Sequence, residues 1–287
     1  MPHQTVDQKF ITLFDRYTHG GMNRRDFLER LSLMAGSSTA AAALLPVLEN
    51  NYAHAEVVLE ADPAIKAATA EIAPGIKGYL VRPAAEGTYG CVLVIHENRG
   101  LNPHIKDVTR RMAKEGFIVF GADYLTAMGG TPEDADKARD MIGLLQAADV
   151  VAFSQTAIAA LAKLPGSNGK VGAIGFCWGG GQVNALAVSG DPNLKAGVAY
   201  YGSQPKDGVA KIAAPLLLHY ASLDERINAG IKDYEAALKS NGKTYELYMY
   251  EGANHAFNND TNAARYNKQA SDLAWSRSVA FLKKYLG

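Results

Sequence analysis

The stretch Gly175-Phe176-Cys177-Trp178-Gly179 decides how the rest of this sequence is interpreted. A reactive side chain with glycines two residues away on either side is typical of a sharp turn from a strand into a helix. The backbone of the central residue is strained there, and larger side chains at the flanking positions would collide. The turn also sets the Cys177 sulfur at a helix N-terminus, where backbone N–H groups and the helix dipole favour a thiolate. A buried structural cysteine beside packing glycines is the alternative interpretation.

Around this turn the sequence alternates strands with helices. The continuous apolar run over residues 91–96 is typical of a strand that is buried on both faces. From residue 68 onward we predict the order β-β-β-α-β-α-α-β-α-β-β-α-β-α, with one helix starting at residues 131–133 and the last helix over 262–285. This alternation indicates an α/β fold with a mostly parallel central sheet and helices on both faces. Ligands bind such sheets at the carboxyl ends of the strands.

An aspartate and a histidine that follow Cys177 later in the chain complete a candidate triad. Asp224 and His255 each follow a predicted strand. Nucleophile, acid and histidine in that chain order, each at a strand end, are the arrangement of an α/β-hydrolase. Glu225 is a competing acid that is better explained as a solvated turn residue.

The chemistry of each group predicts its role. Asp224 fixes the tautomer and orientation of His255, which takes the thiol proton and later protonates the leaving oxygen. Cys177 attacks a carbonyl carbon to give a thioester, which water then hydrolyses. The backbone N–H of Trp178 and an N–H of Asn98, in the loop after the 91–96 strand, are the predicted oxyanion-hole donors.

Composition excludes several kinds of partner and site. Lys and Arg together number 29, as do Asp and Glu, so nothing points to nucleic acid as a partner. The only cysteines, Cys91 and Cys177, lie at opposite ends of their strands, and a disulfide needs Cα atoms within about 7 Å. No CxxC or HExxH spacing occurs, so we expect no metal site and no cofactor. His219, inside a strand, is expected to be a core histidine.

Residues 1–55 differ from the rest of the chain. NRRDFL at residues 23–28 precedes a weakly apolar run over 31–48, and AHA at 53–55 is a small-x-small site of the kind that signal peptidases cut. The arginine pair followed by Phe-Leu resembles a twin-arginine export signal. An amphipathic N-terminal helix with an incidental arginine pair is the alternative.

This interpretation predicts two parts and a location. Residues 1–55 are an export segment and residues 56–287 are one α/β-hydrolase domain that acts in the periplasm. The apolar run is too short and too mild for a transmembrane helix, so we expect no stable membrane insertion after the signal is cleaved.

From residue 68 to the end, the chain resembles the dienelactone hydrolase family, the carboxymethylenebutenolidases. The resemblance rests on GFCWGG at residues 175–180, SNGKVG at 167–172, Asp224, His255 and Glu97. It implies that Glu97 contacts the resting thiol of Cys177 and moves when substrate binds, which keeps the cysteine largely neutral until then. A solvated loop carboxylate is the alternative for Glu97.

The resemblance departs from the family pattern at Asn259. The best-known members have an arginine there that holds the carboxylate of the substrate. Arg99, Arg139 or Arg226 could take over that contact, and Tyr124 could line an apolar pocket or belong to the core. The resemblance therefore implies a small-molecule ester or lactone as substrate and leaves its identity open.

Two functions are compatible with these residues. The first is an ester or lactone hydrolase that uses Cys177, His255 and Asp224. The second is a non-catalytic periplasmic binding or scaffold protein, because folds are reused without their chemistry. The oligomeric state is left open.

Overall fold

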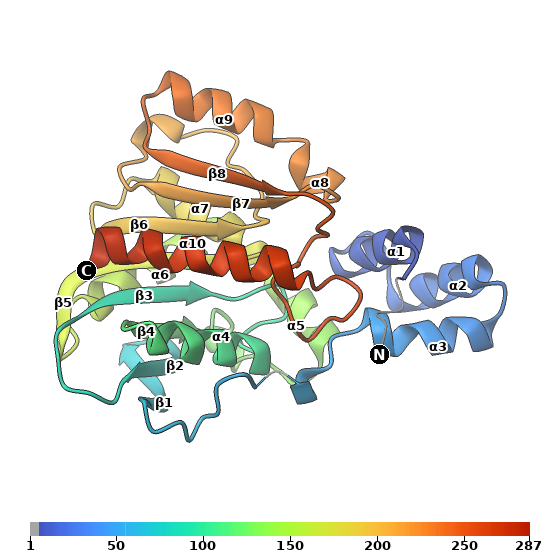
Figure 1. Ribbon diagram of the computed structural model, residues 1–287, viewed down its shortest axis with the longest axis horizontal. Helices are drawn as coiled ribbons and strands as arrows, with labels where there is room; N and C mark the ends of the chain where they lie inside the picture. Colours follow the sequence, from blue (N-terminus) through green and yellow to red (C-terminus); the bar gives the residue numbers. More distant parts are fainter. Residues whose placement is uncertain (1–5, 55) are drawn as a thin grey trace.

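The computed structural model describes residues 6–54 and 56–287, and most of them surround one eight-stranded sheet (Figure 1). Its strands are β1 (Ile65–Ala73), β2 (Ile76–Pro83), β3 (Tyr89–Ile95), β4 (Ile118–Ala122), β5 (Ser167–Phe176), β6 (Leu194–Tyr200), β7 (Leu216–Ala221) and β8 (Tyr245–Tyr250), in the spatial order β1-β2-β4-β3-β5-β6-β7-β8. The β1–β2 and β2–β4 pairs are antiparallel, and all other neighbours are parallel. The carboxyl ends of the parallel strands therefore share one edge, where ligand sites form.

Helices cover both faces of this sheet (Figure 1). They are α4 (Pro103–Lys114), α5 (Ala135–Ile142), α6 (Ala147–Leu161), α7 (Trp178–Ser189), α8 (Glu225–Asn228), α9 (Ile231–Ser240) and α10 (Lys268–Leu286). Side chains of α4 and α10 belong to one core layer, and those of α6, α7 and α9 belong to the other. Within β3, Val92 and Val94 face the first layer while Leu93 and Ile95 face the second. Both faces are covered, which is why this strand is apolar throughout.

The predicted α/β architecture is confirmed, with two helix starts corrected. Helix α5 begins at Ala135 and not at residues 131–133, because the Asp134 carboxylate accepts the N–H groups that open the helix, while Thr131 bonds to Asp123. Helix α10 begins at Lys268 and not at residue 262, because Asn267 caps it. The short helix α8 was not predicted.

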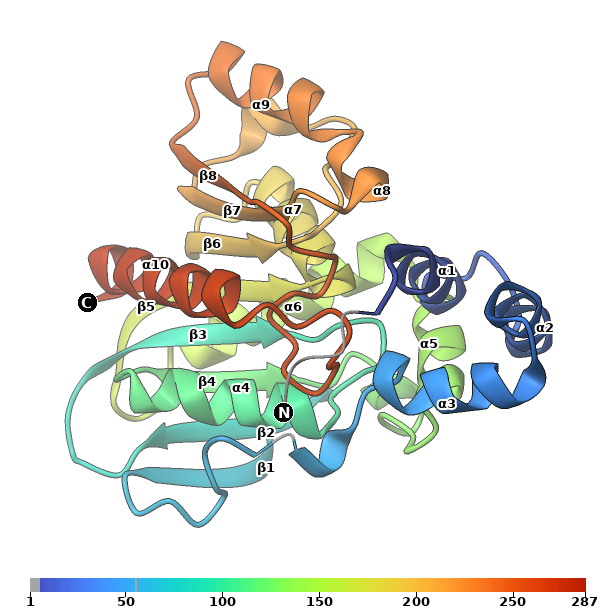
Figure 2. The ribbon, with the colours of Figure 1, turned by 45° about the vertical axis from the view of Figure 1, so that its right-hand side comes forward.

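The N-terminal segment, residues 8–48, forms three helices next to the carboxyl edge of the sheet (Figures 1 and 2). They are α1 (Gln8–Thr18), α2 (Arg24–Ala35) and α3 (Ser38–Leu48). The segment has a small core of its own, in which the Tyr17 and Phe27 rings stack with centroids 4.6 Å apart. Burial of this aromatic surface stabilises the three-helix arrangement.

Among the described residues, no single helix is long and apolar enough to cross a membrane. Two bent helix pairs, α2 with α3 and α5 with α6, pass that test only when each pair is taken together. Ala55, the last residue of the predicted cleavage site, lies outside the described residues.

Candidate active site

Cys177 occupies the turn between β5 and α7 with a left-handed backbone, φ 56° and ψ −116°. The two flanking glycines are required by contact. A Cβ on Gly175 would lie 2.1 Å from the Gly179 carbonyl oxygen, and one on Gly179 would lie 2.2 Å from the carbonyl oxygen of Ile95. Both approaches are far inside van der Waals contact with backbone that cannot move independently. The turn is therefore possible only with glycine on both sides.

The structure brings Asp224 and His255 beside this turn. Asp224 follows β7 and also accepts the Ile227 N–H at 3.3 Å, which fixes its carboxylate at the start of α8. His255 lies in the loop after β8 and donates from Nδ1 to Asp224 Oδ2 at 2.5 Å. The carboxylate thereby orients the ring and leaves Nε2, which is buried, free to act on the Cys177 thiol.

The electrostatics of the site favour a thiolate and an imidazolium. Burial opposes ionisation of Cys177, but the charges of His255 and His19 outweigh it and lower the pKa of the thiol to about 6. Burial likewise opposes a charged His255, but Asp224 and the Cys177 thiolate outweigh it and raise its pKa to about 10. The two groups stabilise each other as an ion pair.

His19, which was not predicted from the sequence, also contacts the Cys177 sulfur. Its Nε2 lies 3.3 Å from Cys177 Sγ, and its ring meets that of His255 edge to face with centroids 4.7 Å apart. The residue follows the last turn of α1, within the segment that is predicted from the sequence to be an export signal. No local pattern around it marks a catalytic residue.

The predicted oxyanion-hole residues, Trp178 and Asn98, line a cavity that Cys177 also borders. Trp178 is the first residue of α7, so its N–H points out of the helix N-terminus. Asn98 lines the same cavity as Cys177, and its side-chain Nδ2 donates to the Thr18 carbonyl oxygen at 2.6 Å. The side chain of Asn98 is therefore hydrogen-bonded to the end of α1, which leaves its backbone N–H as the group that the sequence analysis predicts for the oxyanion hole.

Glu97 also lines this cavity, and its partner explains the departure at Asn259. Asn259 donates from Nδ2 to Glu97 Oε2 at 2.8 Å, and both side chains are buried. Among the described residues, no hydrogen bond joins Glu97 to Cys177, whose sulfur contacts His19 instead. Asn259, where the sequence departs from the family pattern, thus donates to the loop carboxylate of Glu97.

The candidate substrate-binding residues differ in their access to the site. Arg99 lines one cavity at Cys177, while Arg139 and Arg226 line a second cavity that Cys177 also borders. Arg226 Nε lies 3.6 Å from the Asp15 carboxylate on α1. Tyr124 is buried, bonds to Ser154 and lines neither cavity, so it belongs to the core.

The environments of His219 and of the two cysteines agree with the sequence-based predictions. His219 is buried and bonded to Ser278 and Tyr250, as expected of a core histidine. Cys91 and Cys177 are both free thiols, as expected.

Within the described part of the chain, one group of side chains has metal-ligand spacing. Ligand-type atoms of His19, Cys177 and His255 all lie within 4.8 Å of one another. A metal ion bound there would be coordinated by the Cys177 sulfur and would therefore block the attack of that sulfur on a substrate.

A strained cysteine between strand and helix, with a histidine and an acid from the next strand ends, places this protein among the α/β-hydrolases. The family can be stated more closely. The chain belongs to the dienelactone hydrolase family, whose model matches residues 76–286. A second model, described as YqhI-like, matches residues 1–36.

Individual relatives agree with the family. Two proteins named "Putative carboxymethylenebutenolidase" are similar in sequence. The one from Saccharolobus solfataricus is 31% identical and covers 73% of this chain and 94% of its own. The one from Synechocystis is 33% identical and covers 70% and 89%. A crystal structure titled "Putative Dienelactone Hydrolase" from Klebsiella pneumoniae superposes with a TM-score of 0.70 at 29% identity, over 77% of this chain and all of that one.

Proposed function

We propose that this protein hydrolyses ester or lactone bonds of a small molecule, with Cys177 as nucleophile, His255 as general base and acid, and Asp224 as its orienting carboxylate. The observation that carries the proposal is the Asp224–His255 hydrogen bond beside a cysteine in a strained strand-to-helix turn. The names of the relatives agree with this substrate class.

The reaction proceeds in two half-reactions. The Cys177 sulfur attacks the carbonyl carbon, the oxyanion is held by backbone N–H groups, and the C–O bond breaks as His255 gives its proton to the leaving oxygen. Water then attacks the thioester while His255 takes one of its protons, and the acid product leaves as the thiolate is restored.

Hydrolysis of short p-nitrophenyl esters and simple enol-lactones tests this proposal. Cys177→Ala should abolish turnover, and Cys91→Ala is the matched control because Cys91 is the other cysteine and is fully buried away from the cavity. Trapping of an acylated Cys177 by mass spectrometry identifies the intermediate. Equal rates for wild type and Cys177→Ala would refute the cysteine mechanism and favour a binding protein on a hydrolase fold.

We also propose, from the sequence, that the N-terminal segment directs export by a twin-arginine route to the periplasm. The paired arginines, the apolar run and the small-x-small site in that order support this proposal. In the folded chain Arg24 pairs with Glu49 at 3.2 Å, while Arg25 is exposed. N-terminal sequencing of the periplasmic fraction should begin near Glu56. A full-length product found only in the cytoplasm would refute export.

A further inference from the structure

The C-terminal end of helix α1 is directed at the nucleophile. His19 caps this helix, and Gly20, with a φ of 80°, turns the chain away immediately after it. His19 Nδ1 donates to the Asp15 carbonyl oxygen at 2.7 Å. With its proton on Nδ1, the ring presents the Nε2 lone pair to Cys177 Sγ, 3.3 Å away.

The Asp15 carboxylate backs this histidine. Its Oδ1 lies 3.2 Å from His19 Nδ1, one helical turn earlier on the same face. Asp15 and His19 thus form, beside the same sulfur, a second histidine–carboxylate pair next to that of Asp224 and His255. The nucleophile faces two imidazoles, each with a carboxylate on its Nδ1 side.

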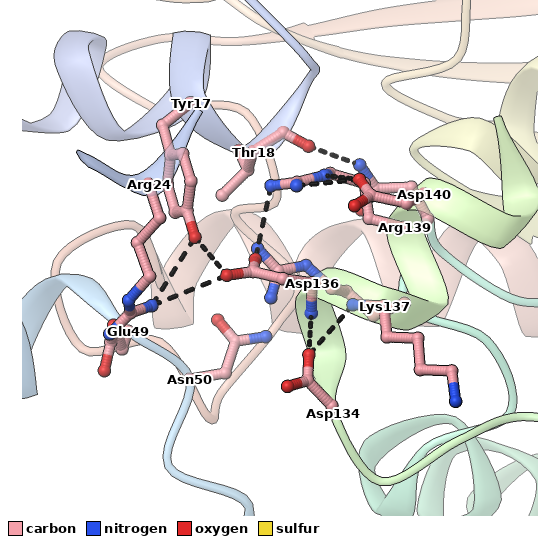
Figure 3. Close-up of polar contacts among 12 residues, drawn as sticks. Tyr17, Thr18, Arg24, Glu49, Asn50, Asp134, Asp136, Lys137, Arg139 and Asp140 are labelled. Atoms are coloured by element: carbon pink, nitrogen blue, oxygen red, sulfur yellow. Dashed lines mark hydrogen bonds and ion pairs between the residues drawn. The ribbon is translucent and has the colours of Figure 1, made fainter. Parts of the chain in front are cut away.

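Contacts along its length hold the N-terminal segment against the hydrolase domain. Figure 3 shows Tyr17 and Arg24 directed at Asp136 of α5, with the Tyr17 hydroxyl hydrogen-bonded to that carboxylate and Arg24 Nη1 3.5 Å from it. At the end of α3, Asn262 donates to the Leu48 carbonyl oxygen at 2.5 Å. Together with the Asn98–Thr18 bond, these contacts fix where α1 ends.

The segment also forms one wall of the cavity at the sulfur. This cavity has a volume of about 380 Å³. Tyr17 and His19 of the segment, and Tyr52 shortly after it, line the cavity together with Glu97 and Cys177. Space remains beside the nucleophile, so the segment shapes the site without filling it.

We propose that, in the full-length chain, His19 is a second imidazole of the active site that stabilises the Cys177 thiolate, and that Asp15 positions it. For its role in turnover this inference rests on the proposed function, and it applies to the chain while the export segment is still attached. The match to the dienelactone hydrolase family begins at residue 76, so it does not include His19. The YqhI-like match over residues 1–36 contains both Asp15 and His19.

The electrostatics agree with this geometry. Burial opposes a charged His19, but the Cys177 thiolate and Asp15 outweigh it and raise the pKa of the ring. The raised pKa of both rings favours their cationic forms, so two imidazolium groups stabilise the Cys177 thiolate. Other titratable or charged groups that face the pair are His255, Asp15, Asp224, Glu97, Tyr201 and Arg265.

The rate of iodoacetamide alkylation against pH, measured on the full-length protein in EDTA, tests this inference without requiring turnover. Cys91 is fully buried, so the signal reports Cys177, with Cys177→Ala as blank. The wild-type midpoint should lie near pH 6. His19→Gln should move the midpoint up by about one pH unit and slow alkylation about fivefold at pH 6, because one of two cationic partners is lost.

Two further variants make the result decisive. Arg16→Gln removes an exposed cation from the same helix and should leave the profile unchanged. Asp15→Asn keeps His19 but removes its carboxylate, and should shift the midpoint upward by less than His19→Gln does. A His19→Gln profile that coincides with wild type would overturn the inference. If His19→Gln fails to fold, an unshifted Asp15→Asn profile would do so. Loss of esterase activity in Cys177→Ala bears only on the proposed function.

Discussion

Replacing Asp224 with asparagine should weaken both the thiolate and the general base. At a pKa of about 6, roughly nine-tenths of Cys177 is thiolate at pH 7, whereas the ordinary value of 9.0 leaves about one-hundredth. Complete loss of the cationic partners would thus slow alkylation at pH 7 by at least about 90-fold, because burial alone raises the pKa of the thiol. Asp224→Asn removes the largest favourable charge on His255 but leaves His19 in place, so we expect a decrease of about tenfold.

The rate of turnover by Asp224→Asn should fall by a larger factor than its rate of alkylation. An asparagine can donate to His255 Nδ1 and thereby favour the wrong tautomer, which cost about 10⁴ in kcat in a serine protease triad. We expect kcat/KM for a p-nitrophenyl ester to fall by about 10³ to 10⁴. The rising limb of the pH profile should also move to higher pH, because the thiolate forms only above its pKa.

Glu225→Gln is the matched control, because it neutralises the neighbouring carboxylate, which is exposed. Its rate and pH profile should match wild type. If Asp224→Asn kept an alkylation midpoint near pH 6 and a kcat/KM within a few-fold of wild type, Asp224 would not be the carboxylate that holds His255.

Three other substitutions follow from contacts in the site. Glu97→Gln removes a negative charge from the cavity wall, so the alkylation midpoint of Cys177 should fall below that of wild type; an unchanged profile would count against a role for Glu97 in tuning the thiol. Asn259→Ala leaves the buried Glu97 carboxylate without its donor and should cost about 1–3 kcal/mol in thermal or urea unfolding; an unaltered midpoint would show that the bond contributes nothing to stability. Gly179→Ala sets a Cβ 2.2 Å from the Ile95 carbonyl oxygen and should lower kcat/KM by at least about 100-fold, since small displacements of a nucleophile are costly; near-normal turnover would mean that the turn can relax.

The fold was predictable because its signals are local. Apolar runs such as β3 and the glycines around Cys177 encode backbone geometry and burial within a few residues. Asp224 and His255 were predictable as a site because the carboxyl ends of parallel strands share one edge of a sheet. The starts of helices α5 and α10 were predicted at the wrong residues, because several neighbouring polar residues could have capped each helix. Only the structure shows that Asp134 and Asn267 do so.

The sequence by itself determined the α/β sheet, the strained turn at Cys177 and the candidates for its acid and histidine. Only the tertiary structure paired Asn259 with Glu97 and brought His19, 158 positions away in the chain, to the Cys177 sulfur. Neither contact has a local signature, because each depends on how separate elements dock and on which side chains then meet. In the first 55 residues the arginine pair predicted an export signal. Docking of helix α1 shows that Tyr17 and His19 of the same segment also line the cavity at Cys177.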